Sequence, residues 1–385
     1  MKHSTDTIMI VGAGPAGLAM AGRLRKLDIP FQILERSNRI AQSWHGHYDR
    51  LCLHTVRHLS GLPHMAIPTD VPKYVPRKEL IKYYENYALT FNIKPVFDEE
   101  AVSIGKKENE HWEIKCRSRR EYHSGFVVVA TGASRIPFQP EIAYQERYRG
   151  TIIHGKYYKN ANSFLNQKVL VIGMGNSGAE IALDLCNRGI EVWISIRGGV
   201  NIIPRDVFGR PTQITAKNLA VLPFHLGDWL GSQIRNWVIG DLTQYGIPKL
   251  TMSPAKQLRQ TGRTPVIDVG TLDRIKSGQI KICPEVIEFT EQGVGLRDGK
   301  EMSFDSVIFA TGYRPGLPDF IRDVRTKLDD NGVPISFIEE EPYSGLYYLG
   351  FNIYELDGIL GTICRDSETI AKDILKKLNA GNAKG

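Results

Sequence analysis

Short apolar runs that lead into a glycine-rich turn and then a helical pattern occur twice along this chain. Residues 8–11 are apolar and precede the turn GAGPAG, a helical pattern that ends near residue 27, and a second apolar run at 31–34. The same order returns with residues 169–172, the turn GMGNSG, a helical pattern to about residue 187 and a run at 192–195. Each unit is predicted to form strand, turn, helix and strand.

Other apolar patterns lie between and after these units. FVVVATGA at residues 126–133 and VIFATGY at 307–313 each predict a buried strand that breaks at Thr-Gly. Apolar residues at helical spacing from 226 to 242 predict an amphipathic helix. Its apolar face is expected to pack on the body of the protein. A wall or lid over an aromatic substrate, a dimer surface and a membrane-facing surface stay open as alternatives.

The first glycine turn has the spacing of a dinucleotide-binding fingerprint. Gly12 permits a tight turn, Gly14 lets the backbone approach a pyrophosphate, and Gly17 allows close packing of helix on strand. The N–H groups at the helix start favour phosphate charge. Glu35 ends the second strand, where a carboxylate can accept hydrogen bonds from a ribose diol. Position at the N-terminus favours FAD over NAD, and the other residues predicted to contact it here are Ala13, Pro15, Ala16 and Arg36.

The second turn repeats this chemistry with a different residue after its second strand. Gly173, Gly175 and Gly178 match the three glycines of the first turn, but the following strand ends in Ser195-Ile-Arg197 instead of an acid. A guanidinium can bind a 2′-phosphate bidentately, whereas a carboxylate would repel it. The turn therefore predicts NADPH, unless Arg197 is only a surface charge. Further predicted contacts are Met174, Asn176, Ser177 and Ser195.

Composition and charge exclude several classes of protein. The chain has 385 residues with a formal net charge of +7, and its densest basic run, RSRR at 117–120, is expected to be an exposed loop, so no nucleic-acid partner is predicted. The five cysteines show no CxxC pair and no metal-like spacing, which predicts reduced thiols, a cytoplasmic location and no metal centre. No apolar stretch is long enough to span a membrane, and membrane contact is not expected.

Several segments resemble the flavin-containing monooxygenases. Residues 148–158, YRGTIIHGKYY, follow the family signature FxGxxxHxxxY, with Tyr148 in place of the usual Phe. YDRL at 48–51 with His54, TGRTPVIDVG at 261–270 and ATGY at 310–313 resemble the plant-type YUCCA branch. The resemblance covers nearly the whole chain. Baeyer–Villiger monooxygenases generally carry Trp where this chain has Tyr158, which favours the YUCCA branch.

The two repeated units, with the two ATG segments as the crossing points between domains, predict an α/β fold with two Rossmann-like dinucleotide-binding domains, the NADPH domain being inserted into a split FAD domain. The expected boundaries are 1–144 and 306–385 for the two parts of the FAD domain and 145–305 for the NADPH domain. The resemblance implies that NADPH reduces FAD, that oxygen adds at flavin C4a, and that the (hydro)peroxide transfers one oxygen atom to a small organic substrate. In the YUCCA branch an aromatic 2-oxo acid such as indole-3-pyruvate is attacked and loses carbon dioxide.

The resemblance also assigns roles to single residues. His54 aligns with a position beside the flavin and is the expected catalytic residue, because a polar group there can hydrogen-bond the flavin or the peroxide. Trp44 matches a position that packs near the flavin. His154 is expected to align the linker into the NADPH domain, and the last helix to begin near Asp366 with its positive end toward the flavin. The strand ends and the C-terminal region are predicted to add cofactor contacts through Thr131, Gly132, Thr311, Gly312 and Gly361.

Departures from the family leave alternatives open. Thr55-Val56-Arg57 stands where Leu-Pro-Lys is frequent, and residues 212–250 are the least familiar segment. N- or S-oxygenation of amines or sulfides and a non-enzymatic FAD- and NADPH-binding redox-responsive protein are therefore kept beside the 2-oxo acid. A disulfide reductase would need a cysteine pair near the flavin, and an amine oxidase would have only the first turn. A homodimer is compatible with the sequence.

Overall fold

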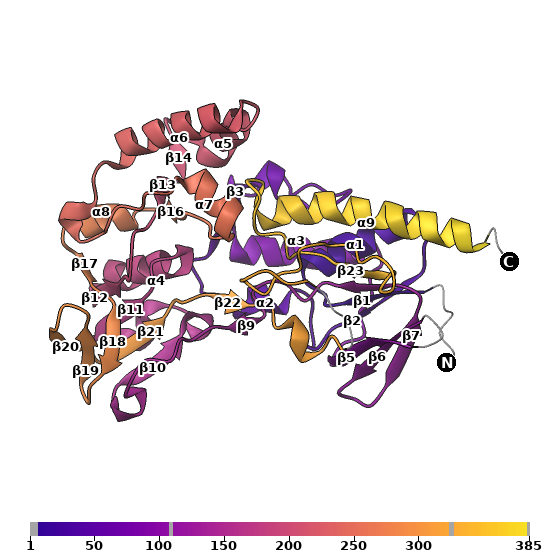
Figure 1. Ribbon diagram of the computed structural model, residues 1–385, viewed down its shortest axis with the longest axis horizontal. Helices are drawn as coiled ribbons and strands as arrows, with labels where there is room; N and C mark the ends of the chain where they lie inside the picture. Colours follow the sequence, from indigo (N-terminus) through magenta and orange to yellow (C-terminus); the bar gives the residue numbers. More distant parts are fainter. Residues whose placement is uncertain (1–6, 108–110, 323–326, 383–385) are drawn as a thin grey trace. The chain divides into compact units, whose positions relative to one another are not determined.

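The computed structural model describes residues 7–107, 111–322 and 327–382, and its chain divides into two units that are interleaved along the sequence. Unit 1 consists of Met1–His45, Thr55–Ile136 and Tyr313–Gly385, and unit 2 of Gly46–His54 and Pro137–Gly312. Each unit contains a parallel sheet and helices that pack on it (Figure 1). The chain is thus an α/β protein.

Unit 1 is built on a four-stranded parallel sheet of order β2-β1-β8-β23. The predicted strands at 8–11 and 31–34 are confirmed, and the strand predicted at 126–133 is shorter, because its Thr-Gly end leaves the sheet. An antiparallel sheet covers one face, where Met9 and Val11 share a buried cluster with Trp112 and Ile114. The parallel strands are β1 (Ile8–Val11), β2 (Phe31–Leu34), β8 (Val127–Val129) and β23 (Leu346–Tyr348), and the antiparallel ones β5 (Ala101–Lys106), β6 (Trp112–Cys116) and β7 (Glu121–Ser124).

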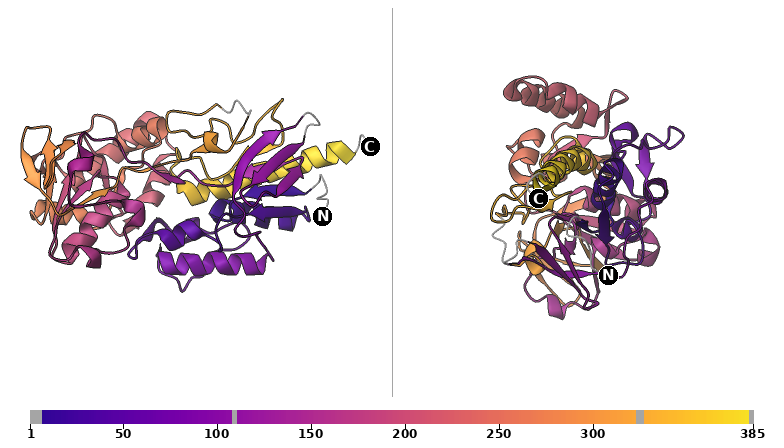
Figure 2. Two further views of the ribbon diagram at one scale, coloured as in Figure 1. Left: turned by 90° about the horizontal axis from the view of Figure 1, so that it is seen from below. Right: turned by 90° about the vertical axis from the view of Figure 1, so that its right-hand side faces the viewer.

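The helices of unit 1 include the one that follows the first glycine turn and the C-terminal helix, which pack against each other (Figure 2). The C-terminal helix begins at Gly358, so the expected start near Asp366 is wrong. Leu360 and Ile363 are buried at a helical spacing of three residues and extend the apolar face toward the N-terminus. The helices are α1 (Pro15–Lys26), α2 (Gln42–Gly46, which ends in unit 2), α3 (Arg77–Thr90) and α9 (Gly358–Asn382).

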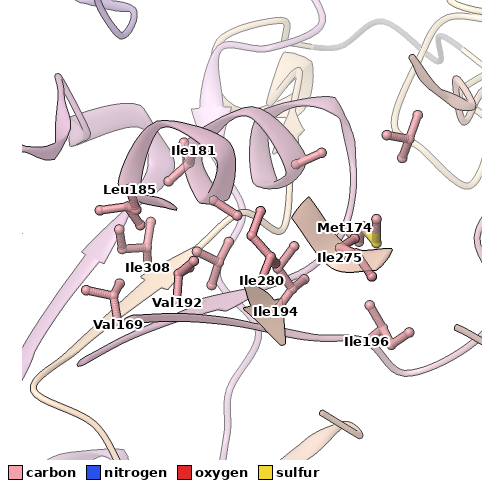
Figure 3. Close-up of a cluster of buried hydrophobic side chains, with 14 of the residues drawn as sticks. Val169, Met174, Ile181, Leu185, Val192, Ile194, Ile196, Ile275, Ile280 and Ile308 are labelled. Atoms are coloured by element: carbon pink, nitrogen blue, oxygen red, sulfur yellow. The ribbon is translucent and has the colours of Figure 1, made fainter. Parts of the chain in front are cut away.

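Unit 2 contains a five-stranded parallel sheet of order β10-β21-β11-β12-β17. Ile181 and Leu185 of α4 pack on Val169, Val192 and other apolar strand residues (Figure 3). The antiparallel strands β18 to β20 contribute to a second buried cluster, which contains Phe289 and Leu296. The elements are β10 (Thr151–His154), β11 (Lys168–Ile172), α4 (Asn176–Asn187), β12 (Glu191–Ser195), α8 (Thr271–Lys276), β17 (Ile280–Cys283), β18 (Val286–Phe289), β19 (Gly293–Leu296), β20 (Glu301–Ser303) and β21 (Ser306–Phe309).

The amphipathic helix of unit 2 is present, but its side chains are less buried than predicted. Of the residues of α6, only Gly227 and Ile239 are buried, whereas Trp229 is 56% and Trp237 is 74% exposed. The expectation that its apolar face packs on the protein body is therefore wrong, because the two Trp side chains of that face remain exposed. Among the described residues, no helix has both the length and the apolar character to cross a membrane. The neighbouring elements are β13 (Ile202–Pro204), α5 (Thr212–Leu219), α6 (Phe224–Ile239), α7 (Pro254–Thr261) and β16 (Val266–Asp268).

Candidate functional site

The first glycine turn joins β1 to α1 at the carboxyl edge of the unit 1 sheet. Gly12 has φ +109°, and a Cβ there would lie 2.7 Å from the carbonyl oxygen of Ala130. A Cβ at Gly17 would lie 1.9 Å from the carbonyl oxygen of Gly12. At Gly14 a Cβ would meet nothing within 4 Å. The outer glycines are therefore required by the turn itself, while the middle glycine borders open space where a ligand can approach the backbone.

The start of α1 has backbone donors to offer to an anion. Gly14 is its N-cap and has no side chain to satisfy the first N–H groups, and the first turn contains no acidic residue. Pro15 fills the first helical position, where its missing N–H costs nothing. The buried residues Ala13 and Ala16 flank the turn. An uncapped helix start of this kind is a binding site for phosphate groups.

Glu35 lies at the carboxyl end of β2, beside the first turn, and is 8% exposed. Its Oε2 accepts the N–H of Ala13 at 2.7 Å, and its Oε1 accepts the N–H and hydroxyl of Ser37 at 2.9 and 2.8 Å. A carboxylate has about four acceptor sites, so these three hydrogen bonds leave room for another donor. The protein fixes this carboxylate in place before any ligand arrives. Arg36, the next predicted contact, is exposed.

The strand that ends at Ala130 adds an unsatisfied polar group to this edge. The hydroxyl of Thr131 is buried and has no hydrogen-bond partner among the described residues, and Gly132 has φ +81° with nothing within 4 Å of an added Cβ. A buried hydroxyl without a partner is costly and fits a missing ligand.

Trp44, in α2, has its ring 6.0 Å from the ring of Tyr84, centroid to centroid. Gly361 lies within α9, where a Cβ would approach that of Asp357 to 2.7 Å.

The second glycine turn repeats this geometry in unit 2. Gly173 has φ +103°, and its added Cβ would lie 2.8 Å from the carbonyl oxygen of Ala310. A Cβ at Gly178 would lie 2.1 Å from the carbonyl oxygen of Gly173, whereas one at Gly175 would meet nothing within 4 Å. Gly175 caps α4 without a side-chain hydrogen bond, and no acid lies in the first turn of that helix. This turn is a second candidate phosphate cradle.

The other predicted residues of this turn have partners within unit 2. The side-chain amide of Asn176 accepts the N–H of Ile267 at 2.7 Å and donates to the carbonyl of Pro265 at 3.3 Å. Its amide therefore anchors the 261–270 segment, a role that was not predicted from the sequence. The side chain of Met174 is buried in the core, which leaves its backbone as the part that can face a ligand.

Ser195 and Arg197 follow the second strand of unit 2 but differ in exposure. Ser195 is buried, and its hydroxyl donates to the carbonyl of Pro284 at 2.8 Å. Arg197 is exposed, and no hydrogen bond or ion pair of its side chain is found within the described residues. Its guanidinium retains all its donors for an anionic partner.

His154 holds the segment at which the chain returns to unit 1. Its Nδ1 accepts the N–H of Lys156 at 3.0 Å, so Nε2 carries the proton and donates to the carbonyl of Gly312 at 3.1 Å. Burial lowers the pKa of this imidazole. These contacts join His154 to Gly312, and its aligning role stays a prediction. The hydroxyl of Thr311 donates to the carbonyl of Phe138, and Gly312 has φ +89° with open space beside it.

His54 belongs to unit 2, although it precedes most of unit 1 in the sequence. Its Nε2 lies 3.0 Å from Oε1 of Glu180, a buried residue of α4. The buried hydroxyl of Tyr48 lies 3.2 Å from the same oxygen. Glu180 and Tyr48 were not predicted from the sequence as partners of His54. One signal was present: Glu180 is a charged residue within the otherwise apolar stretch that follows the second turn.

The structure also locates the cysteines and the potential metal ligands. All five cysteines are free. In the described part of the chain, the potential metal ligands that converge are Glu113, Glu121 and His123 of the β6–β7 hairpin. Lys107 and Lys115 lie 3.2 and 3.3 Å from the Glu113 carboxylate and already balance its charge.

Comparison with known proteins places this geometry in a family. Residues 9–206 match the family described as "Pyridine nucleotide-disulphide oxidoreductase". The probable indole-3-pyruvate monooxygenase YUCCA4 of Arabidopsis thaliana is 38% identical and covers 95% of this chain and 89% of its own length. The indole-3-pyruvate monooxygenase YUCCA1 of Oryza sativa subsp. japonica is 37% identical over 95% of this chain and 90% of its own length.

Solved structures share the fold at lower identity. The flavin-containing monooxygenase from Stenotrophomonas maltophilia has a TM-score of 0.75 and 18% identity over 97% of this chain and 99% of its own. The protein OTEMO, in complex with FAD and NADP, has a TM-score of 0.73 and 14% identity over 99% of this chain and 87% of its own. These likenesses extend over both units.

Proposed function

Since the chain belongs to the pyridine nucleotide-disulphide oxidoreductase family and is a flavin-dependent monooxygenase similar to the YUCCA enzymes, we propose that FAD binds at the turn of unit 1 and NADPH at the turn of unit 2. The observation that carries this proposal is the pair of uncapped helix starts, each with open space at its middle glycine, Gly14 or Gly175. The domains would then be two Rossmann-like folds, with FAD held by 1–144 and 306–385 and NADPH by 145–305.

The residues after each second strand support this assignment. Glu35 presents a fixed carboxylate where a ribose diol would lie, and the hydroxyl of Thr131, which has no partner in the described part of the chain, offers a further hydrogen bond. Arg197 offers a free guanidinium where the 2′-phosphate of NADPH would lie. When bound, reduced flavin supplies the activation of molecular oxygen. The protein binds and orients the cofactors and the substrate, and it excludes water.

The substrate we propose is an aromatic 2-oxo acid such as indole-3-pyruvate. The two YUCCA relatives described above carry that substrate in their names. The C1–C2 bond of the oxo acid breaks, carbon dioxide leaves, and one oxygen atom enters the shortened carboxylic acid. The other oxygen atom becomes water, with NADPH and a proton providing the reducing equivalents. His54, which contacts Glu180 of α4 in unit 2, would form a hydrogen bond with the reacting oxygen.

The test uses the purified full-length protein and a panel of indole-3-pyruvate, phenylpyruvate, a tertiary amine and a thioether. We expect bound FAD to be visible by absorbance, NADPH to be preferred over NADH, and the oxo acids to yield carbon dioxide and the shortened acid by product mass. N- or S-oxides, with the oxo acids leaving NADPH oxidation uncoupled, would refute the 2-oxo acid. A protein that stays colourless when offered FAD would refute the cofactor assignment.

A further inference from the structure

One face of α4 carries polar residues, some of which lie beyond the first turn that would bind phosphate. Ser177, Glu180 and Asp184 are spaced by three and four residues, so they line one side of the helix. Tyr48 approaches Glu180, and the hydroxyl of Tyr158 donates to Oδ2 of Asp184 at 2.6 Å. The Gly46–His54 segment of unit 2 therefore meets the helix through polar contacts.

The pairing of His54 with Glu180 determines how the imidazole is protonated. A carboxylate oxygen at 3.0 Å from Nε2 accepts a hydrogen bond, so Nε2 carries a proton. Nδ1 is buried and has no hydrogen-bond partner among the described residues. The second nitrogen is thus the one still able to interact with a ligand, and a buried nitrogen without a partner favours such a ligand.

We infer that Glu180 is the positioning residue of His54, which fixes Nε2–H in the imidazole and leaves Nδ1 as the nitrogen that can accept a hydrogen bond from a ligand. This inference rests on the role of His54 in the proposed function. It also attaches His54 to the helix whose first residues form the proposed NADPH cradle, because Glu180 lies about one turn beyond Asn176. The imidazole would therefore be carried by the nucleotide-binding unit.

The surroundings of Glu180 favour this role over simple packing. Burial raises the pKa of the Tyr48 hydroxyl, and the Glu180 charge adds to the rise. Burial also raises the pKa of the Cys52 thiol, and the Glu180 charge adds to this rise. The charges of Arg205 and Arg50 lower it. The Tyr48 hydroxyl and the Cys52 thiol thus stay neutral, and His54 is an ionisable base in direct contact with the carboxylate. Burying a carboxylate is costly, and Tyr48 alone would need only a neutral acceptor to hold the segment in place.

The first experiment reads the tautomer directly. Protein labelled with 15N and 13C histidine is studied by NMR with FAD and NADP+ present, and the His54 signals are assigned by their loss in His54→Gln. We expect Nε2-protonated imidazole in the wild type. Glu180→Met, an apolar replacement of similar length, should abolish the single tautomer, and Glu180→Gln should retain it through its carbonyl oxygen. Tyr158→Phe, which removes a hydrogen bond to Asp184 on the same helix face, is the matched control and should change nothing.

The second experiment measures coupled turnover, meaning product formed per NADPH oxidised. We expect Glu180→Met to lower coupled turnover by about 10- to 100-fold, with little change in KM for NADPH, and Glu180→Gln to restore most of it. The double variant with His54→Gln should be no worse than His54→Gln alone, because two residues that act as one unit are not additive. Retention of the tautomer in Glu180→Met, or an additive double variant, would overturn the inference.

The two proposals fail differently. If His54→Gln turns over as efficiently as the wild type, the role of His54 in the proposed function is wrong and the positioning role falls with it. If His54→Gln is impaired while Glu180→Met is not, only the positioning role is wrong. Folding of each variant is checked by its thermal unfolding midpoint and its visible flavin absorbance.

Discussion

The two glycine turns share their backbone geometry but differ in what the protein places beside them. In unit 1, Glu35 is buried and makes three hydrogen bonds within the unit. In unit 2, Arg197 is exposed and makes none among the described residues. One polar group is held ready by the fold, and the other can be ordered only by its ligand. This difference suits a cofactor that stays bound and one that enters and leaves in each cycle.

The largest effect is expected where a side chain would collide with the turn itself. Gly17→Ala and Gly178→Ala each place a Cβ about 2 Å from a carbonyl oxygen of the backbone, at 1.9 and 2.1 Å. The turn must open, which should cost at least about 1–3 kcal/mol and abolish binding. We expect Gly17→Ala to lose FAD, measured by absorbance after gel filtration, and Gly178→Ala to keep FAD but lose NADPH oxidation.

The middle glycines are the matched controls for this prediction. Gly14→Ala and Gly175→Ala place their Cβ in open space, so the flavin-free protein should unfold at an unchanged temperature. Only ligand affinity should fall, because the methyl group occupies the room left for the phosphates. A large loss of stability in these controls, or an intact site in Gly178→Ala, would contradict the equivalence of the two turns.

The next effect distinguishes the two turns by charge. Arg197→Ala should raise KM for NADPH by about 10- to 100-fold, since a charge-assisted hydrogen bond contributes about 1.5–3 kcal/mol. KM for NADH should hardly change, so the measurement is the ratio of the two. Arg188→Ala removes another exposed arginine, just beyond the end of α4, and should leave the ratio unaltered. An equal loss for both nucleotides would show that Arg197 does not read the 2′-phosphate.

A smaller effect is expected at Glu35, the acidic residue of unit 1 that corresponds to Arg197 of unit 2. Glu35→Gln keeps the shape of the side chain but removes its charge and turns one of its two acceptors into a donor facing an N–H group. We expect the affinity for FAD, titrated into the flavin-free protein, to fall about 10-fold while KM for NADPH is unchanged. Glu288→Gln, in β18 of unit 2, is the control. A change in NADPH binding instead of FAD binding would reverse the assignment of the two turns.

The sequence predicts these turns well because their geometry is local. Strands at 8–11, 31–34 and 192–195 follow from short apolar runs, and the three-glycine spacing gives the positive φ at Gly12 and Gly173. What the sequence could not provide depends on contacts between distant segments. Periodicity shows that α6 has an apolar face, but not whether anything covers it. The crossing of Gly46–His54 into unit 2 has no local signal, so the pairing of His54 with Glu180 emerged only in three dimensions.

The smallest effect concerns Tyr148, where this chain departs from the family signature in the segment that enters unit 2. Its hydroxyl donates to the carbonyl of Phe304 at 2.8 Å, and its ring lies 5.5 Å from that of Phe289. Tyr148→Phe restores the usual residue but leaves a buried carbonyl without its donor. We expect a loss of about 1 kcal/mol in the free energy of unfolding, measured by urea denaturation, with unchanged binding of both dinucleotides.

The pH dependence of this loss tests whether the Tyr148 hydroxyl is buried in the folded protein. Burial raises the pKa of Tyr148 from 10.0 to about 12. Between these values the unfolded chain gives up the phenolic proton more readily than the folded one, so the stabilisation is complete below pH 10 and is lost as the pH rises through 12. The difference between wild type and Tyr148→Phe should therefore be constant up to pH 10 and shrink above it. Tyr157→Phe removes an exposed hydroxyl and should match the wild type throughout, while a difference independent of pH would contradict the raised pKa of the buried Tyr148 hydroxyl.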